Sequence, residues 1–154
     1  MENARIKSLI QVLTSARSED AEKAWTELRT LGEEVVPFLE AAYPGAAKWQ
    51  GRVSLVFHAI PFARTSEAAY RLGLAALQDK STMVRYRACG LLAYSLRRDA
   101  LPALRKLLRH PDARTVEDAR AAITAIEAKN HHLFVDRART GRLFWEVGRH
   151  TPKG

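Results

Sequence analysis

The 154-residue sequence has few of the residues that cross-link a chain or anchor it in a membrane. Its single cysteine, Cys89, excludes an internal disulfide, and the apolar neighbours of Cys89 predict a buried, unreactive thiol. Residues 1–13 carry charges and lack the apolar run of a secretory signal, which predicts a cytoplasmic location. No apolar stretch is long enough to predict membrane insertion.

The motifs of common enzymes are also missing. The chain has no glycine-rich phosphate loop, no nucleophile elbow and no paired carboxylates in an apolar setting. Its five histidines do not stand at metal-ligand spacing with other ligands, and His131 and His132 would point to opposite faces of an expected strand. His58 lies in an apolar helical pattern and is expected to be a hydrogen-bonded core residue. We therefore predict no catalytic residue, no metal and no cofactor.

Charge is distributed unevenly along the chain. The formal net charge is +8, but residues 1–44 carry a net −3 and residues 45–154 a net +11. A basic surface of this kind attracts nucleic acid, an anionic membrane or an acidic protein. An ordinary solvated basic surface is the alternative interpretation.

Apolar residues recur at helical spacing over most of the chain, with Ser, Thr, Gly and Pro at the breaks. Pro44-Gly45 is a predicted turn, and Pro61 is expected to end or kink its helix. The expected helices cover residues 3–13, 18–31, 33–43, 48–63, 66–77, 81–96, 99–109 and 115–129.

These helices are internally repetitive. Aligning the first helix of each pair superposes Ala21, Val53, Ala88 and Ala119, which recur at similar but unequal intervals. Among the second helices, the segment that begins Val36-Pro37 matches the one that begins Leu101-Pro102. Stacked repeats share a continuous core and leave an extended surface free, so the pattern over residues 1–129 favours binding over chemistry.

Leaving out the first helix, the others pair in chain order, and the third pair, expected over 81–96 and 99–109, resembles the HEAT repeat in its bacterial HEAT-like form. The residues that carry the resemblance are Asp79, Val84-Arg85, Ala88, Leu91-Leu92 and Leu101-Pro102-x-Leu104. The resemblance covers residues 18–129 and implies an all-α, right-handed α-α superhelix that acts as a scaffold. In that family the Asp and Arg tie neighbouring repeats together, which implies structural roles for Asp79 and Arg85. The second pair departs from the pattern, because its order is reversed as Arg52-Val53.

After Lys129 the periodicity changes. Two β-rich runs flank a turn with Gly141 and predict a β-hairpin over 130–147, followed by a frayed end at 148–154. The hairpin is either a hydrophobic cap on the stack or a partner-binding element. The partner-binding interpretation assigns the contact to residue types common at interface hot spots: Arg137, Arg139, Arg142, Phe144 and Trp145.

The tail is similar to the ends of HEAT-like proteins associated with bacterial toxin-immunity loci, which implies a protein partner. We therefore expect a non-enzymatic protein-binding module, in an immunity or adaptor role, with an acidic protein as one possible partner. The alternative is a nucleic-acid-binding protein similar to the HEAT-like alkylpurine DNA glycosylases but without catalysis. Its concave basic face would be formed by Arg71, Arg105, Lys106 and Arg109.

Overall fold

The computed structural model describes residues 1–148, and every predicted helix forms within them. The described chain is all-α and contains no β-strand. The α-helices are Asn3–Ser15 (α1), Ser18–Leu28 (α2), Val36–Ala42 (α3), Trp49–Ala59 (α4), Glu67–Ala76 (α5), Thr82–Ser95 (α6), Leu101–Lys106 (α7) and Ala113–Glu127 (α8). Short 3-10 helices span Arg29–Val35 (η1), Tyr43–Gly45 (η2), Ile60–Phe62 (η3), Arg98–Ala100 (η4), Leu107–Arg109 (η5) and His131–Phe134 (η6).

Prolines and serines set several helix ends as the sequence predicts. Pro37 and Pro102 lie in the first turns of α3 and α7, where the missing amide has no intrahelical partner to lose. Pro61 follows the end of α4 and lies in η3. The Ser81 side chain accepts a hydrogen bond from the Val84 amide and caps α6. Ser18, which as a serine at the start of an expected helix would be a natural N-cap, is instead the first residue of α2 and makes no side-chain cap.

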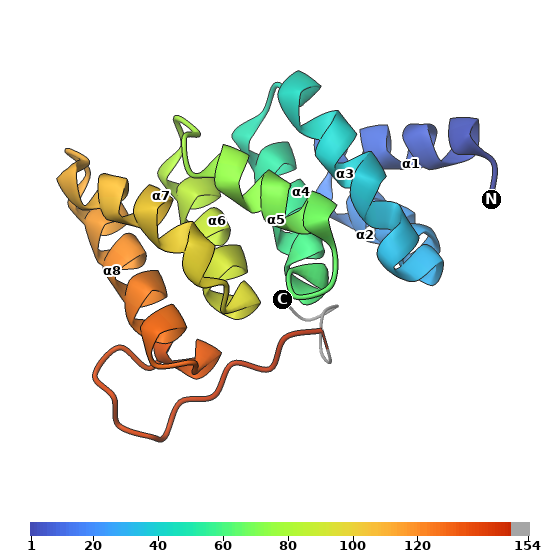
Figure 1. The fold of residues 1–154 in the computed structure, drawn as a ribbon. Coiled ribbons are helices and arrows are strands. Elements are labelled where there is room, and N and C mark those ends of the chain that lie inside the picture. Colours follow the sequence, from blue (N-terminus) through green and yellow to red (C-terminus); the bar gives the residue numbers. More distant parts are fainter. Residues whose placement is uncertain (149–154) are drawn as a thin grey trace.

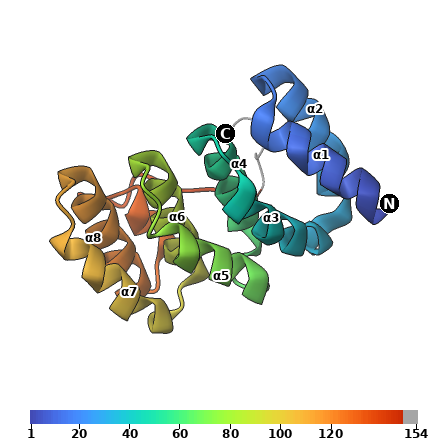
Figure 2. The ribbon, with the colours of Figure 1, turned by 90° about the horizontal axis from the view of Figure 1, so that it is seen from above.

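The helices lie in two layers. Figure 2 shows α3, α5 and α7 along one side and α4, α6 and α8 along the other. Helices α4, α6 and α8 pack one against the next, and α1 packs on α2 and on the open side of α4 (Figure 1). The core between the layers is built from fully buried Leu, Val, Ile and Ala side chains, with Cys89 among them. Burial raises the pKa of the Cys89 thiol, as expected for an unreactive group.

The contact between α1 and α4 depends on a glycine. A Cβ added at Gly51 would lie 2.3 Å from the Thr14 carbonyl oxygen, which is part of the rigid backbone of α1. Only a residue without a side chain therefore allows the two helices to approach this closely.

The predicted β-hairpin over 130–147 is wrong. Its first run forms η6, because the Asn130 side chain accepts the His132 amide and starts a helical turn instead of a strand. Its second run continues as an extended segment, residues 142–148, which we call the strap. The strap runs back past α6 towards the end of α4, where Gly148 lies near Pro61 (Figure 1). Of the expected frayed end, residues 149–154 lie outside the described residues.

No helix within residues 1–148 is both long and apolar enough to cross a membrane.

Candidate binding site

Buried ion pairs join successive helix pairs. Arg52 on α4 donates from Nε to Asp79 at 2.8 Å, and from Nη1 to the carbonyl oxygens of Ala46 and Ala47. The Asp79 carboxylate also accepts the Tyr43 hydroxyl. Both ionic side chains are almost fully buried. This arrangement ties the start of α4 to the loop before α6.

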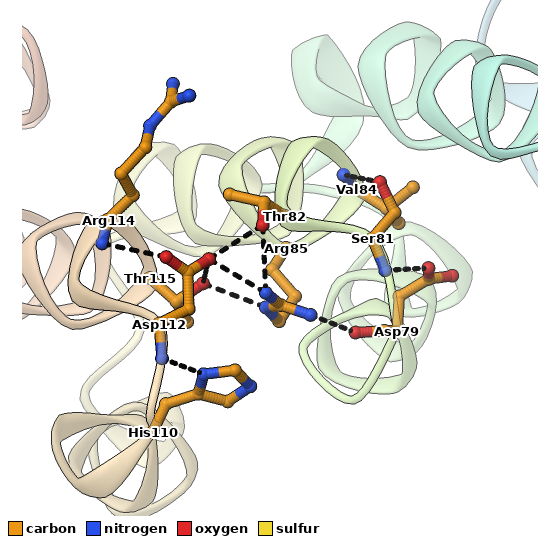
Figure 3. A network of polar contacts seen from close by, with 9 residues as sticks. All are labelled: Asp79, Ser81, Thr82, Val84, Arg85, His110, Asp112, Arg114 and Thr115. Carbon is orange, nitrogen blue, oxygen red and sulfur yellow. Dashed lines mark hydrogen bonds and ion pairs between the residues drawn. The ribbon is translucent and has the colours of Figure 1, made fainter.

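The same arrangement recurs one repeat later (Figure 3). Arg85 on α6 donates to Asp112 at 3.0 Å, to the Thr115 hydroxyl at 2.9 Å and to the Asp79 carbonyl oxygen at 2.7 Å. The Thr82 hydroxyl donates to the same Asp112 oxygen at 2.7 Å. The network ties α6 to the start of α8, as the HEAT resemblance implies for Arg85. We call this series of buried arginine–aspartate pairs the ladder.

These contacts correct the repeat alignment. The interval from Arg52 to Arg85 equals the interval between their partners, Asp79 and Asp112. The alignment on apolar positions instead pairs Val53 with Ala88 and gives unequal intervals. The structural repeat is therefore constant between these two junctions, and Arg52 is the true counterpart of Arg85.

The carboxylates of the ladder stay ionised. Burial alone would raise the pKa of Asp79, but hydrogen bonds from Arg52, Tyr43 and the Ser81 amide hold that pKa below its usual value. Hydrogen bonds from Thr82 and Thr115 chiefly lower the pKa of Asp112. Since their polar atoms are engaged within the chain, these residues stabilise the stack and do not form a ligand site.

At the C-terminal end of the ladder, the acidic and the basic residue exchange places. Asp118 on α8 follows Arg85 at the same interval at which Arg85 follows Arg52, so an acid occupies the position of the ladder arginine. Asp118 accepts a hydrogen bond from Arg137 Nη1 at 3.1 Å, and Arg137 also donates from Nε to the Phe134 carbonyl oxygen. Burial raises the pKa of Asp118, and Arg137 opposes that rise. Arg137, a predicted partner-binding residue, therefore attaches the C-terminal segment to the stack.

The loop between η6 and the strap is organised by a buried carboxylate. Asp136 is 2% exposed and accepts hydrogen bonds from the amide and hydroxyl of Thr140 and from the amide of Gly141. These bonds lower the pKa of Asp136. Arg139 and Gly141 have positive φ. The φ of Gly141 is +74°, which agrees with the turn predicted at this glycine. The loop therefore holds a defined shape.

Trp145 is the second predicted partner-binding residue that faces the stack. Its indole lies 5.5 Å from the Phe134 ring and 6.1 Å from the Tyr94 ring, measured between ring centroids. A Cβ added at Gly90 of α6 would lie 3.4 Å from the Trp145 ring and 3.2 Å from the Phe134 ring. Because Gly90 has no side chain, both aromatic rings can pack closely against α6 at this position.

Two histidines hold the main chain of the strap. The Trp145 amide donates to His132 Nδ1 at 2.8 Å, and the Trp145 carbonyl oxygen lies 2.9 Å from His131 Nε2. The His131 and His132 rings lie next to each other, with 4.0 Å between centroids, and both contact the Trp145 main chain, contrary to the prediction that they point to opposite faces of a strand. Their side chains replace the strand partner that a hairpin would have supplied.

The remaining predicted partner-binding residues project outwards. Phe144 is 67% exposed and the neighbouring Leu143 is 53% exposed, which makes them two of the most exposed large apolar side chains in the described chain. Arg139 and Arg142 are exposed beside them and form no ion pair within residues 1–148. We call these four residues the tip. The tip combines apolar and cationic groups on an ordered backbone.

The predicted basic face is partly neutralised. Arg71 is paired with Glu40 at 2.9 Å, and Arg105 with Glu127 at 3.4 Å. Lys106 and Arg109 are exposed near the end of α7 and have no ion-pair partner within residues 1–148. The face is thus less cationic than its sequence suggests.

A hollow of about 300 Å³ lies between α2 and α4. Its floor includes Trp25, which stacks on His58 with 3.9 Å between ring centroids. Within residues 1–148, His58 stacks on this ring and forms no side-chain hydrogen bond, contrary to the prediction. Burial, with help from Arg87, lowers its pKa to about 4, so the imidazole is neutral at pH 7, and its stacking favours a packing role.

Within residues 1–148, no cluster of three or more His, Cys, Asp or Glu side chains is arranged to hold a metal ion. Sequence reasoning missed two features of the site: the paired role of His131 and His132, and the exposure of Leu143. The signal for the first was Asn130, a good helix N-cap immediately before both histidines. Comparison with protein-family models and with curated proteins gives no match for this chain.

Proposed function

We propose that this protein is a non-enzymatic protein-binding module with a HEAT-like, right-handed superhelical scaffold. The equal spacing of the Arg52 and Arg85 junctions and of their aspartate partners supports the scaffold. The proposed role is that of an immunity or adaptor protein, in which binding a partner protein is the whole activity.

The exposed tip is the observation that carries this proposal. Phe144 and Leu143 stay in solvent although the loop behind them is fixed by Asp136 and the strap by His132. Aromatic and arginine side chains are common at interface hot spots, and a backbone that is already ordered does not have to be ordered on binding. Arg139 and Arg142 favour a partner with carboxylates around an apolar pocket.

The structure divides the five predicted partner-binding residues into two groups. Arg139, Arg142 and Phe144 are exposed and are the proposed partner contacts, whereas Arg137 and Trp145 attach the segment that presents them. Leu143 joins the first group. Loss of binding in a Trp145 variant would therefore reflect loss of presentation.

The proposal predicts that Phe144→Ala combined with Arg142→Glu removes partner binding and leaves the fold intact. Truncating a hot-spot aromatic costs about 2 kcal/mol or more, roughly thirtyfold in Kd. Tagged protein would be recovered from its native cells after nuclease treatment, and co-purifying proteins identified and tested for direct binding. Trp49→Ala is the matched control, because Trp49 is also exposed, at 45%, but lies at the start of α4.

Two results would contradict the proposal. A stoichiometric partner that binds the tip variant as tightly as the wild type would remove the tip from the interface. Recovery of nuclease-sensitive nucleic acid alone would favour the basic face instead. In that case Arg105→Glu with Arg109→Glu should weaken binding to every sequence, and affinity should fall steeply with salt.

A further inference from the structure

Two histidine side chains hold the main chain of the strap at Trp145, and the bond to His132 requires a neutral ring. His132 Nδ1 accepts the Trp145 amide at 2.8 Å, so this nitrogen carries no proton. Protonation of His132 would place an N–H donor against another N–H donor. The bond that fixes the strap main chain would then be lost.

His131 is constrained in the same way from both sides of its ring. Its Nε2 faces the Trp145 carbonyl oxygen at 2.9 Å and must donate, while its Nδ1 lies 3.1 Å from Arg64 Nη2 and must accept. A second proton on Nδ1 would point at a guanidinium group. Arg64 cannot withdraw easily, because its Nε donates to the Tyr94 carbonyl oxygen and its guanidinium lies over the Tyr94 ring.

The surroundings of His131 favour its neutral form. Around its ring lie Arg64 before α5, Tyr94 on α6, His132 on η6 and Glu146 on the strap. Burial is the largest cause that lowers the pKa of His131, and His132 and Arg64 lower it further. The hydrogen bond to Trp145 and the charge of Glu146 oppose the shift without cancelling it.

His132 contacts two successive residues of the strap, Phe144 and Trp145. Its ring meets the Phe144 ring edge to face at 5.3 Å, in addition to binding the Trp145 amide. By contrast, the loop of residues 136–141 is held by Asp136 and η6 by the buried Phe134. Protonating the histidines would therefore free the strap and leave the loop in place.

We propose that His131 and His132 form a proton-released latch, which docks the strap on α6 at neutral pH and releases it in acid, so that the tip is presented only above the transition. The consequence for binding rests on the proposed function, whereas release of the strap does not. A free histidine has a pKa near 6.5. Since the docked state lowers the pKa of His131, docking is fully stabilised above about 6.5 and weakens as the pH falls below that value.

The test is a titration of the full chain by ¹H–¹⁵N NMR from pH 7.5 to 5.0. In the wild type, the Trp145 amide should move from its hydrogen-bonded position to that of a free chain. Each pKa unit of difference between docked and free histidine changes the docking equilibrium tenfold. The amide of Leu92, buried in α6, should not move, which separates release of the strap from unfolding of the stack.

The matched variant is His131→Gln with His132→Asn. The Gln amide nitrogen can replace Nε2 as the donor to Trp145, and the Asn carbonyl oxygen can replace Nδ1 as the acceptor, but neither side chain titrates in this range. Its Trp145 amide should keep the docked position at every pH. The latch is refuted if the wild-type amide stays docked at pH 5.0, or if the double variant shows the same transition.

This titration uses no partner, so failure of the proposed function would leave its result unchanged. If a partner is found, wild-type Kd should rise as the pH falls from 7.5 to 5.5, and Kd of the double variant should rise less.

Discussion

The polar contacts that hold the helix stack together differ in kind from those that hold the strap in place. In the stack, Arg85 and Asp112 carry permanent charges at neutral pH and are tied to hydroxyls and backbone on both sides of a repeat junction. In the strap, the Trp145 main chain depends on neutral His131 and His132. The stack contacts should persist over the whole physiological pH range, whereas the strap contacts should not.

Position 118 lies where these two regions meet. The ladder needs an arginine there to continue, but Asp118 can pair only with a cation, which Arg137 supplies from the C-terminal segment. The C-terminal segment thus takes the place of a further repeat at the end of the stack. It terminates the core without adding another helix pair, and it leaves the tip exposed.

The largest effect is expected from breaking the ladder. Arg85→Ala removes the guanidinium donor that Asp112, the Thr115 hydroxyl and the Asp79 carbonyl oxygen share, and Arg85 is only 5% exposed. Losing several charge-assisted hydrogen bonds of a buried guanidinium should lower the free energy of unfolding by roughly 3 kcal/mol. Urea unfolding at pH 7.5 would measure this loss. Arg71→Ala is the matched control: its pair with Glu40 is exposed to solvent, so a much smaller loss is expected.

Equal losses in the two arginine variants would contradict the distinction between the ladder and the surface ion pairs.

An effect confined to docking of the C-terminal segment, and therefore smaller for unfolding of the stack, is expected from Phe134→Ala. Phe134 is 2% exposed, and its ring contacts the Trp145 ring with 5.5 Å between centroids. Truncating a buried Phe costs about 3–5 kcal/mol, here taken mainly from docking of the C-terminal segment. Hydrogen exchange at neutral pH should show lost protection in residues 131–148 and retained protection in α4 and α6. Loss of protection throughout would mean that the stack needs its C-terminal cover to fold.

The helices were predictable because their signals are local. Apolar spacing, Pro37, Pro102 and Pro61 each act through the chain within one or two turns, and the helix bounds follow from them. The repeat register was less clear from apolar residues alone, since alanine and valine fit several alignments. Requiring one interval for both the arginines and the aspartates of the ladder would have given the correct register directly.

The C-terminal segment was not predictable from residue preference. Phe134, Val135 and Trp145 favour strands by composition, and a hairpin needs their backbones to pair with each other. In the structure, the Trp145 backbone pairs with histidine side chains instead, and the rings pack on Gly90 of α6. Contacts between segments this far apart in the chain leave no periodic signal, so Arg137 and Trp145 looked like candidates for a partner.

The smallest effect is expected at the junction of the two regions. Burial raises the pKa of Asp118 in the folded chain, so its ionised form costs stability at neutral pH, and this cost disappears as the pH falls through the folded pKa. Asp79 has the opposite sign: its lowered pKa adds stability above its unfolded pKa that is lost as the pH falls through the folded pKa. Asp118→Asn keeps an acceptor for Arg137 and removes the buried charge, so we expect a change within about 1 kcal/mol at pH 7.5. Urea unfolding at pH 7.5 and 5.0 would measure it. A loss as large as that of Arg85→Ala would show that the reversed pair at position 118 stabilises the stack as the ladder does, and the boundary between the two regions would then lie beyond Arg137.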